Sequence, residues 1–327
     1  MRAIRQYAFG GPEELRLEEE MPDPHPAADE VRIRVESAGV HLLDTMIRQG
    51  RGGPRVAPSL PMTPGREVAG VIDEVGADVD PDLLGRRAVA DLGAAGGGYA
   101  ELAPAPSANV HLIPDDLDAD SAVAMVGTGR TTMAILELAA PTAGDVVLVT
   151  AAAGGVGTLL VQATHSIDAT VVGVAGGPDK VALVDRIGAD HAIDYTRPGW
   201  PDAVREALAG RSVTLALDGV GGEIGRSALE LLGVAGRLVM FGSSSGSLTE
   251  LSAGDLFGRG ISVASAVGAR ILQRPDGTRA LERSALQAVT DKRLVPVIGR
   301  RFPLAGAADA HLALQSRATT GKTVLRP

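Results

Sequence analysis

A glycine-rich turn is the first group of residues that could do chemistry. The segment Ala152-Ala153-Gly154-Gly155-Val156-Gly157 has the spacing G-x-G-x-x-G, with alanine in the first place. We expect a buried strand before it, over 146–150, and a helix after it, over 156–166. Such a turn lets a pyrophosphate approach the backbone closely, and the helix N-terminus offers N–H groups to the phosphates. A plain tight turn has the same residues, so the flanking strand and helix are what favour dinucleotide binding.

The residues after the next expected strand indicate which dinucleotide binds. An NAD site usually carries Asp or Glu about 20 residues past the glycines. This chain has Ala175-Gly176-Gly177 at that distance, and Lys180 follows. A lysine there could meet a 2′-phosphate, although most lysines are simply solvated. We therefore favour NADPH, bound near Gly176 and Lys180, and keep NADH as the alternative because Asp179 lies beside Lys180.

His41 and Asp44 form a second group, one that could move protons. They lie at the start of a short helix expected over 41–49. Histidine changes charge near neutral pH, so His41 could donate a proton while Asp44 orients its ring. The alternative is that His41 only begins the helix and that Asp44, in the first turn, favours the helix dipole.

The secondary structure expected around these groups divides the chain into two regions. The first 110 residues or so predict a β-rich region, with strands such as 31–35, 68–75 and 87–90 and many prolines that interrupt helices. From about residue 118, apolar strands alternate with helices, the pattern of a parallel sheet covered on both faces. The expected strands are 146–150, 170–175, 191–194, 213–218, 236–241 and 261–264, and the expected helices are 156–166, 178–187, 200–209 and 222–232. Six strands in this rhythm predict a doubly wound dinucleotide-binding fold.

Composition excludes several classes of site. The 327 residues include no cysteine, which removes disulfides, thiolate catalysis, iron–sulfur clusters and thiolate zinc sites. The net charge of −9 argues against nucleic acid as a partner. The uncharged stretch 146–164 is long enough to suggest a membrane span, but its change of period predicts a strand, a turn and a helix. We expect a cytoplasmic protein with no membrane partner.

Ordered motifs along the whole chain carry a resemblance to a known family. They include Phe9-Gly10-Gly11-Pro12-Glu13, Pro64-Gly65-Arg66-Glu67-Val68-Ala69-Gly70, Gly98-Tyr99-Ala100-Glu101, the glycine turn, Asp218-Gly219-Val220-Gly221-Gly222 and Gly321-Lys322-Thr323-Val324-Leu325. With these motifs the sequence resembles the zinc-independent quinone oxidoreductases of the medium-chain dehydrogenase/reductase superfamily. The resemblance implies an α/β chain made of a GroES-like β-rich catalytic domain and a doubly wound Rossmann nucleotide-binding domain. We expect the catalytic domain over 1–118, the nucleotide domain over 119–265, and a return to the catalytic domain over 266–327.

The resemblance also implies an active site in the cleft between the domains and a homodimer, and it suggests roles for further residues. Thr131 aligns with a family threonine near the nicotinamide, although a helix-capping role is as good an interpretation. Tyr195 aligns with a residue near the 2′-phosphate. Tyr99 could line the substrate pocket or be a core tyrosine with a satisfied hydroxyl. Lys322 could reach the cofactor phosphates or be solvated at the final turn, and Gly242 and Ser243 follow a strand end where ligand loops lie.

Two departures from the family pattern concern metal and substrate. Zinc-dependent relatives have Cys and His where this chain has His41 and Arg66. His41, Asp44 and Glu67 could in principle hold a metal, but Arg66 would repel it and is expected to pair locally, so we expect no zinc. Relatives that reduce quinones usually have Asn at the place of His41 and often Tyr at that of Met46, which leaves the substrate open.

The sequence therefore predicts an NADPH-dependent, zinc-independent reductase that transfers hydride to a quinone or an α,β-unsaturated carbonyl. An enoyl-thioester reductase of the same superfamily is the first alternative. The second is an NADPH-binding protein with little turnover, acting as a sensor or as a structural protein.

Overall fold

The chain folds into two compact units in a computed structural model that describes residues 1–51, 59–275 and 277–327. The first unit comprises residues 1–127 and 296–327, and the second comprises residues 128–295. We expected the boundaries after residues 118 and 265. The contacts place them later because α2 (Ala119–Ala124) packs on β3, β4 and β5 of the first unit, whereas α10 (Arg279–Thr290) packs on α3 (Arg130–Ala139) of the second.

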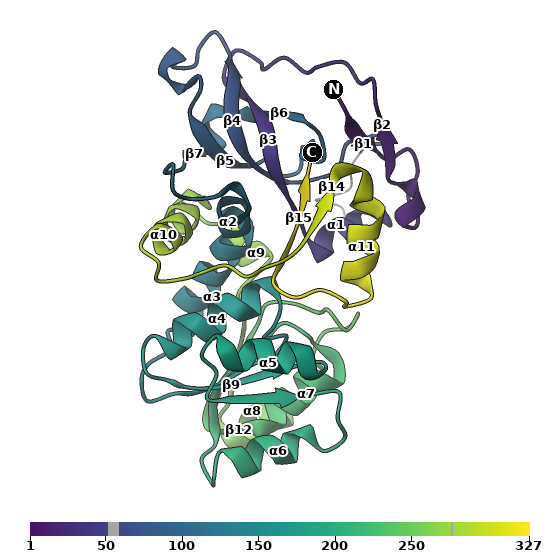
Figure 1. The fold of residues 1–327 in the computed structure, drawn as a ribbon. Helices are drawn as coiled ribbons and strands as arrows, with labels where there is room; N and C mark the ends of the chain where they lie inside the picture. The colour runs from purple at the N-terminus through teal and green to yellow at the C-terminus, as the bar shows by residue number, and fades with distance from the viewer. Residues whose placement is uncertain (52–58, 276) are drawn as a thin grey trace. The chain divides into compact units, whose positions relative to one another are not determined.

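The first unit is built on a seven-stranded sheet with a small two-stranded sheet beside it (Figure 1). The strand order is β14-β15-β3-β4-β5-β7, and β6 also pairs with β3. Alternating apolar residues of β3, among them Val31, Ile33 and Val35, enter one apolar core, as expected for a half-buried strand. The elements are β1 (Ala3–Arg5), β2 (Arg16–Glu18), β3 (Glu30–Val40), α1 (Leu42–Arg48), β4 (Glu67–Val75), β5 (Arg87–Asp91), β6 (Leu102–Pro106), β7 (Val110–Leu112), α2, β14 (Ile298–Pro303), α11 (Ala307–Gln315) and β15 (Lys322–Arg326), with 3₁₀ turns at Pro12–Glu14, Pro81–Leu83, Ser107–Asn109 and Leu304–Gly306.

The last strand of the chain is what completes this sheet. β15 runs parallel to β14 and antiparallel to β3, with Thr323 opposite Val40. β3 in turn pairs with β4, with Ala38 opposite Val68. The register therefore gathers the start of β15, the end of β3 and the start of β4, which lie far apart in the sequence.

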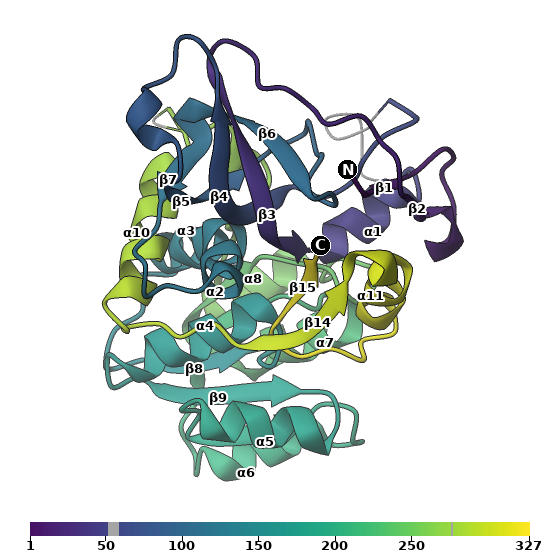
Figure 2. The ribbon, with the colours of Figure 1, turned by 45° about the horizontal axis from the view of Figure 1, so that its top comes forward.

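The second unit is a six-stranded parallel sheet with the strand order β10-β9-β8-β11-β12-β13. Numbered from its first strand, this is the order 3-2-1-4-5-6 of the doubly wound dinucleotide-binding fold. β8 and its neighbours are buried, because helices cover both faces of the sheet. Figure 2 shows α5 beside β9, as their contacts require.

The elements of the second unit are α3, β8 (Val146–Val149), α4 (Gly155–His165), β9 (Thr170–Ala175), α5 (Pro178–Arg186), β10 (His191–Asp194), α6 (Trp200–Ala207), β11 (Val213–Asp218), α7 (Gly222–Leu231), β12 (Leu232–Met240), α8 (Ala253–Arg259), β13 (Ser262–Ser265), α9 (Ala269–Leu272) and α10, and a π turn over Met125–Gly129 precedes α3. The expected strands and helices of the second unit all form close to their expected bounds, and α3, α8 and α9 are helices that we did not expect. β12 begins earlier than expected, because the chain passes from α7 into extended backbone at Leu232 without a loop. No helix in the described part of the chain is both long and apolar enough to span a membrane.

Candidate functional site

The glycine turn connects β8 to α4 in the second unit, as the sequence predicts. Gly154 is the N-cap of α4, in extended backbone. A Cβ atom on Gly157 would lie 2.2 Å from the carbonyl oxygen of Ala151 and 2.8 Å from the Cα of Ala152. Only glycine permits this contact between the helix and the turn, and the close packing leaves the first N–H groups of the helix directed at the end of the sheet. The turn therefore fits a pyrophosphate.

The glycine turn would contact a ligand mainly through backbone atoms rather than side chains. Ala152 and Ala153 are buried in the apolar core of this unit, while Val156 is half-buried. Any contact of Ala153 with a ligand would therefore be made by its backbone. The parts of Ala153, Gly154, Gly155, Val156 and Gly157 in binding stay a prediction, and their placement at a strand–helix junction is the one that binding needs.

The expected ribose-end residues meet at the carboxyl ends of β9 and β10. Gly176 follows β9, and a Cβ atom on it would lie 3.3 Å from the hydroxyl oxygen of Tyr195, which follows β10. Lys180 lies in the first turn of α5, which begins after Gly177. Gly177 has a φ of 92°, so it is in the region that favours glycine, and nothing lies within 4 Å of the position of a Cβ atom.

Asp194, the acidic residue at this end, is engaged within the loop. Its Oδ1 accepts hydrogen bonds from the backbone N–H groups of Gly177 and Thr196 and from the Thr196 hydroxyl. These hydrogen bonds hold the pKa of Asp194 below its usual value. The carboxylate that fixes the Gly177 turn thus comes from β10, and β9 itself ends without one.

The carboxyl ends of β11 and β12 carry a buried carboxylate to which we assigned no role from the sequence. Asp218 is fully buried, and its two oxygens accept bonds from the hydroxyls of Thr150 and Thr249 and from the backbone N–H groups of Val220 and Gly221. The carboxylate therefore fixes the loop after β11. Its signal in the sequence was the motif that begins with Asp218 itself.

Gly242 and Ser243 leave the adjacent strand, β12. A Cβ atom on Gly242 would lie 2.7 Å from the carbonyl oxygen of Gly219, so this loop packs directly on the loop after β11. Ser243 is half-buried. Both residues lie at the end of the sheet where doubly wound folds bind ligands, and their contact with a cofactor stays a prediction.

Thr131 does not cap a helix. It is the second residue of α3, and the π turn Met125–Gly129 leads directly into that helix. The N-cap of α3 is Gly129, which is already in helical backbone, and Thr131 lies two residues further along the helix. The alternative interpretation of Thr131 as a cap is therefore wrong, and its alignment with a residue near the nicotinamide stays a prediction.

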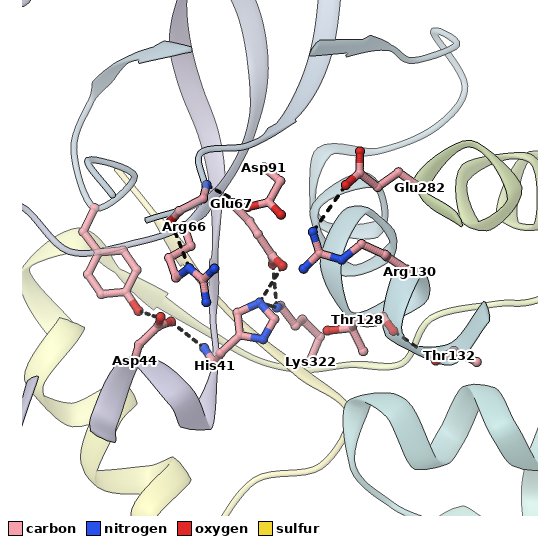
Figure 3. A network of polar contacts seen from close by, with 12 residues as sticks. His41, Asp44, Arg66, Glu67, Asp91, Thr128, Arg130, Thr132, Glu282 and Lys322 are labelled. Atoms are coloured by element: carbon pink, nitrogen blue, oxygen red, sulfur yellow. Dashed lines mark hydrogen bonds and ion pairs between the residues drawn. The ribbon is translucent and has the colours of Figure 1, made fainter. Parts of the chain in front are cut away.

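In the first unit, His41 joins two residues that lie far from it in the sequence (Figure 3). His41 Nε2 lies 2.6 Å from Glu67 Oε1 and 2.7 Å from Lys322 Nζ, and Lys322 Nζ donates to Glu67 Oε2 over 2.8 Å. We call these three residues the His41 trio. The side chains of Glu67 and Lys322 are only 3% and 4% exposed, whereas that of His41 is 28% exposed. The imidazole is therefore the part of the trio that solvent reaches.

Two close backbone approaches hold Glu67 in this position. A Cβ atom on Gly39 would lie 2.4 Å from Glu67 Oε2, and one on Gly127 would overlap Glu67 Oε1. Burial raises the pKa of Glu67, but the charges and hydrogen bonds of His41 and Lys322 outweigh burial and hold the pKa well below its usual value. Glu67 is therefore a carboxylate.

This placement corrects the expectation for Lys322. The side chain is buried in an ion pair within the first unit, so it is not a solvated lysine at the final turn. Arg66 does form a local contact, because its Nε donates a hydrogen bond to the carbonyl oxygen of Gly93.

Asp44 does not orient the imidazole ring of His41 by a direct contact. Its Oδ2 accepts from the backbone N–H of His41 over 2.8 Å, at the start of α1. His41 is the N-cap of α1 and Asp44 lies in its first turn, while the group against the ring is Glu67, so a catalytic role of His41 stays a prediction. Burial, the first of several influences, raises the pKa of Asp44.

Tyr99 is a core residue with a satisfied hydroxyl. It is fully buried, and its hydroxyl lies 3.2 Å from Asp44 Oδ2 and 3.1 Å from His311 Nε2. Arg48, also buried, lies 3.1 Å from His311 Nδ1. Tyr99 therefore does not line an open pocket, and it supports the start of α1 through Asp44.

The chemistry of the donors fixes the direction of this chain of bonds. Arg48 cannot accept, so it donates to Nδ1 of His311. Burial and the charge of Arg48 lower the pKa of His311 to about 3, so the ring is neutral and its Nε2–H donates to Tyr99. Tyr99 then donates to Asp44. We left His311 without a role from the sequence, because its partners are distant in the chain and no spacing pattern links them.

The expectation that no zinc binds stays a prediction. No three histidine, aspartate or glutamate side chains converge as metal ligands within residues 1–51, 59–275 and 277–327. In the His41 trio the ammonium group of Lys322 contacts both His41 and Glu67, which puts a fixed positive charge where a cation would need their lone pairs.

Comparison with known proteins assigns both units. The family model of the alcohol dehydrogenase GroES-like domain matches residues 27–115, and that of the zinc-binding dehydrogenase matches residues 155–285. A quinone oxidoreductase of Pseudomonas aeruginosa is 32% identical over 336 residues, covering 100% of this chain and 99% of the relative.

Two solved structures are similar over their full lengths. Escherichia coli quinone oxidoreductase complexed with NADPH has a TM-score of 0.88, 27% identity and coverage of 100% of both chains. A mycobacterial protein complexed with NADPH has a TM-score of 0.87, 31% identity and coverage of 100% of both chains. The chain therefore belongs to the quinone oxidoreductase-like family of the medium-chain dehydrogenase/reductase superfamily.

Proposed function

We propose that the protein is an NADPH-dependent reductase that transfers hydride to a quinone or an α,β-unsaturated carbonyl and that works without zinc. Membership of the family supports the oxidoreductase activity, and two similar structures are complexes with NADPH. The proposal of a dinucleotide cofactor rests on the glycine turn, where Gly157 packs on the Ala151 carbonyl and leaves the N-terminus of α4 open to phosphate.

NADPH would be held by backbone at one end of the parallel sheet. The turn from Ala153 to Gly157 would bind the pyrophosphate, and Gly176, Lys180 and Tyr195 would bind the phosphorylated ribose. Gly242 and Ser243 lie at the end of the same sheet. When bound, the nicotinamide supplies a hydride, and the protein has to align it and stabilise the charge that grows on the acceptor oxygen.

Lys180 provides the test of cofactor choice. Replacing Lys180 with alanine removes a charge-assisted contact to the 2′-phosphate, worth about 1.5–3 kcal/mol, so NADPH binding should weaken roughly 10- to 100-fold. NADH has no such phosphate and should bind equally well to both proteins. Titration calorimetry with the two cofactors measures the difference, and Lys292→Ala, at an exposed lysine, is the matched control. Equal loss of both cofactors would contradict the assignment.

Zinc independence is proposed from the His41 trio. The residues that stand at zinc-ligand places are His41 and Arg66, the chain has no cysteine, and Lys322 donates into the space between His41 and Glu67. In place of a metal, His41 would then stabilise the charge on the acceptor oxygen by donating a hydrogen bond to it. Dialysis against a zinc chelator should leave activity unchanged.

A panel of acceptors tests the function itself. We expect NADPH oxidation with quinones or enones and none with enoyl thioesters. Turnover restricted to enoyl thioesters would favour the alternative reductase, whereas tight NADPH binding with no turnover on any acceptor would leave a binding protein. Comparing His41→Ala with His41→Asn isolates the role of the ring, and unchanged turnover in both would make His41 structural.

A further inference from the structure

A pocket in the first unit opens beside Asp44 and Arg66. Its walls include the apolar side chains of Ile47 and Met62, and among the described residues that line it only Asp44 and Arg66 carry a charge. Asp44 connects the pocket to the start of α1, because its Oδ2 accepts from the backbone N–H of His41. The pocket therefore lies next to the helix start at which His41 would donate to the acceptor.

One side of the half-buried Arg66 guanidinium is held, and the other side is free. Its Nε donates to the carbonyl oxygen of Gly93 over 2.9 Å. In the part of the chain that the structure describes, the terminal nitrogens Nη1 and Nη2 have no hydrogen-bond or ion-pair partner. Figure 3 shows the guanidinium pointing toward Asp44, while Glu67, the next residue of the chain, pairs with Lys322 instead. Arg66 is thus oriented by the backbone and keeps two donors for a ligand.

A second guanidinium group lies at the same pocket. Arg5 of β1 donates from Nη1 to the hydroxyl of Thr63, a lining residue, and from Nη2 to the carbonyl oxygen of Pro61, each over 3.3 Å. It forms no ion pair with any acidic residue outside the segments 52–58 and 276. The guanidinium groups of Arg5 and Arg66 therefore stand against one carboxylate, that of Asp44, and the pocket has a surplus of one positive charge.

We propose that Arg66 is a specificity-determining residue that binds a carboxylate group of the acceptor, so that the preferred substrates are quinones or enones that carry a carboxylate. This rests on the proposed function and narrows its substrate class. Because Nε is occupied by Gly93, the two terminal nitrogens are left to donate side by side to the two oxygens of a carboxylate. The apolar walls strengthen this pairing, since they lower the local dielectric constant. A carboxylate also balances the surplus of one positive charge, which a phosphate dianion would exceed.

Two acceptors that differ in this charge test the proposal. They are β-acetylacrylate, an enone that carries a carboxylate, and its methyl ester. For Arg66→Met we expect the ratio of kcat/KM for the acid to kcat/KM for the ester to fall roughly 10- to 100-fold, the range of hydrogen bonds to a charged group. Comparing ratios between proteins cancels the different intrinsic reactivities of the two acceptors. Arg66→Lys should restore only part of the ratio, because an ammonium group lacks the planar pair of donors.

The matched control is Arg34→Met, at an exposed arginine of β3, and it should keep the ratio of the wild type. If Arg66→Met weakened the reaction of the acid and of the ester equally, Arg66 would only support the fold of the pocket, and the proposal would be overturned.

A binding measurement separates this proposal from hydride transfer. Without NADPH nothing is reduced, so an NMR titration with levulinate, the saturated counterpart of β-acetylacrylate, and with its methyl ester measures binding alone. We expect levulinate to bind the wild type more tightly than the ester, Arg66→Met to remove this preference, and added salt to weaken levulinate alone, because salt screens the ion pair. Equal affinities of the wild type for the two ligands would overturn the proposal, whether or not the protein reduces quinones. A preference for levulinate in a protein that reduces no acceptor would support the anion site and contradict only the proposed function.

Discussion

Replacing Glu67 with alanine is expected to destabilise the protein by about 3–5 kcal/mol. The carboxylate forms an ion pair with Lys322, whose side chain is only 4% exposed. Removing the Glu67 carboxylate takes away this counter-charge while the ammonium group stays buried, so the attraction no longer offsets the cost of desolvating the ammonium. Glu67→Gln should also destabilise, since the amide neutralises no charge. Urea unfolding followed by circular dichroism measures the change.

An exposed ion pair supplies the matched control for Glu67. Asp202 pairs with Arg205 over 2.6 Å on the surface of α6, with side chains 80% and 55% exposed. Asp202→Ala should cost less than about 1 kcal/mol, because solvent screens the pair. If Glu67→Ala cost no more than Asp202→Ala, the buried ion pair described here would not form in solution.

Acid should destabilise the protein through His311. The pKa of His311 is lowered to about 3 in the folded protein by burial and by Arg48, while an unfolded histidine titrates near 6.5. Below about pH 6.5 this histidine is protonated in the unfolded chain but stays neutral in the folded one. The free energy of unfolding that it contributes is therefore fully present above about pH 6.5 and falls as the pH decreases. The slope due to this residue approaches 1.4 kcal/mol per pH unit between about pH 6 and pH 3.

His311→Gln isolates this contribution. Glutamine can accept from Arg48 and donate to Tyr99, but it does not titrate. We expect the free energy of unfolding of the wild type to fall more steeply than that of His311→Gln between pH 7 and pH 4. Asp44, whose pKa is raised, has the opposite effect on the slope, but it is present in both proteins. His165→Gln, at an exposed histidine, is the control, and parallel pH curves for wild type and His311→Gln would show that His311 is protonated when folded.

The sequence predicts the second unit well because its signals are local. The strand, turn and helix around Gly154 lie within 20 residues or so, and the period of apolar residues changes where the strand gives way to the helix. The same alternation predicts β8 to β11 and α4 to α7 almost to their bounds. The early start of β12 was not predicted, since Gly233 and Gly236 indicate a turn between the helix and the strand.

The candidate site in the first unit depends on register, which has no local signal. His41 and Lys322 are 281 residues apart, and only the pairing of β15 with β3, and of β3 with β4, brings Lys322 to Glu67 and His41. Asp44 shows a different limit. Its spacing from His41 suits either a helix cap or a contact with the ring, and the extended backbone of His41 decides for the cap.

NADPH oxidation in the presence of a zinc chelator, measured against a series of quinones and enones, tests the central claim most directly. The protein should oxidise NADPH with at least one of these acceptors, at a rate that the chelator leaves unchanged and that His41→Ala lowers by roughly 100-fold or more. Activity that disappears with the chelator and returns with zinc, or NADPH binding without oxidation by any acceptor, would contradict the account.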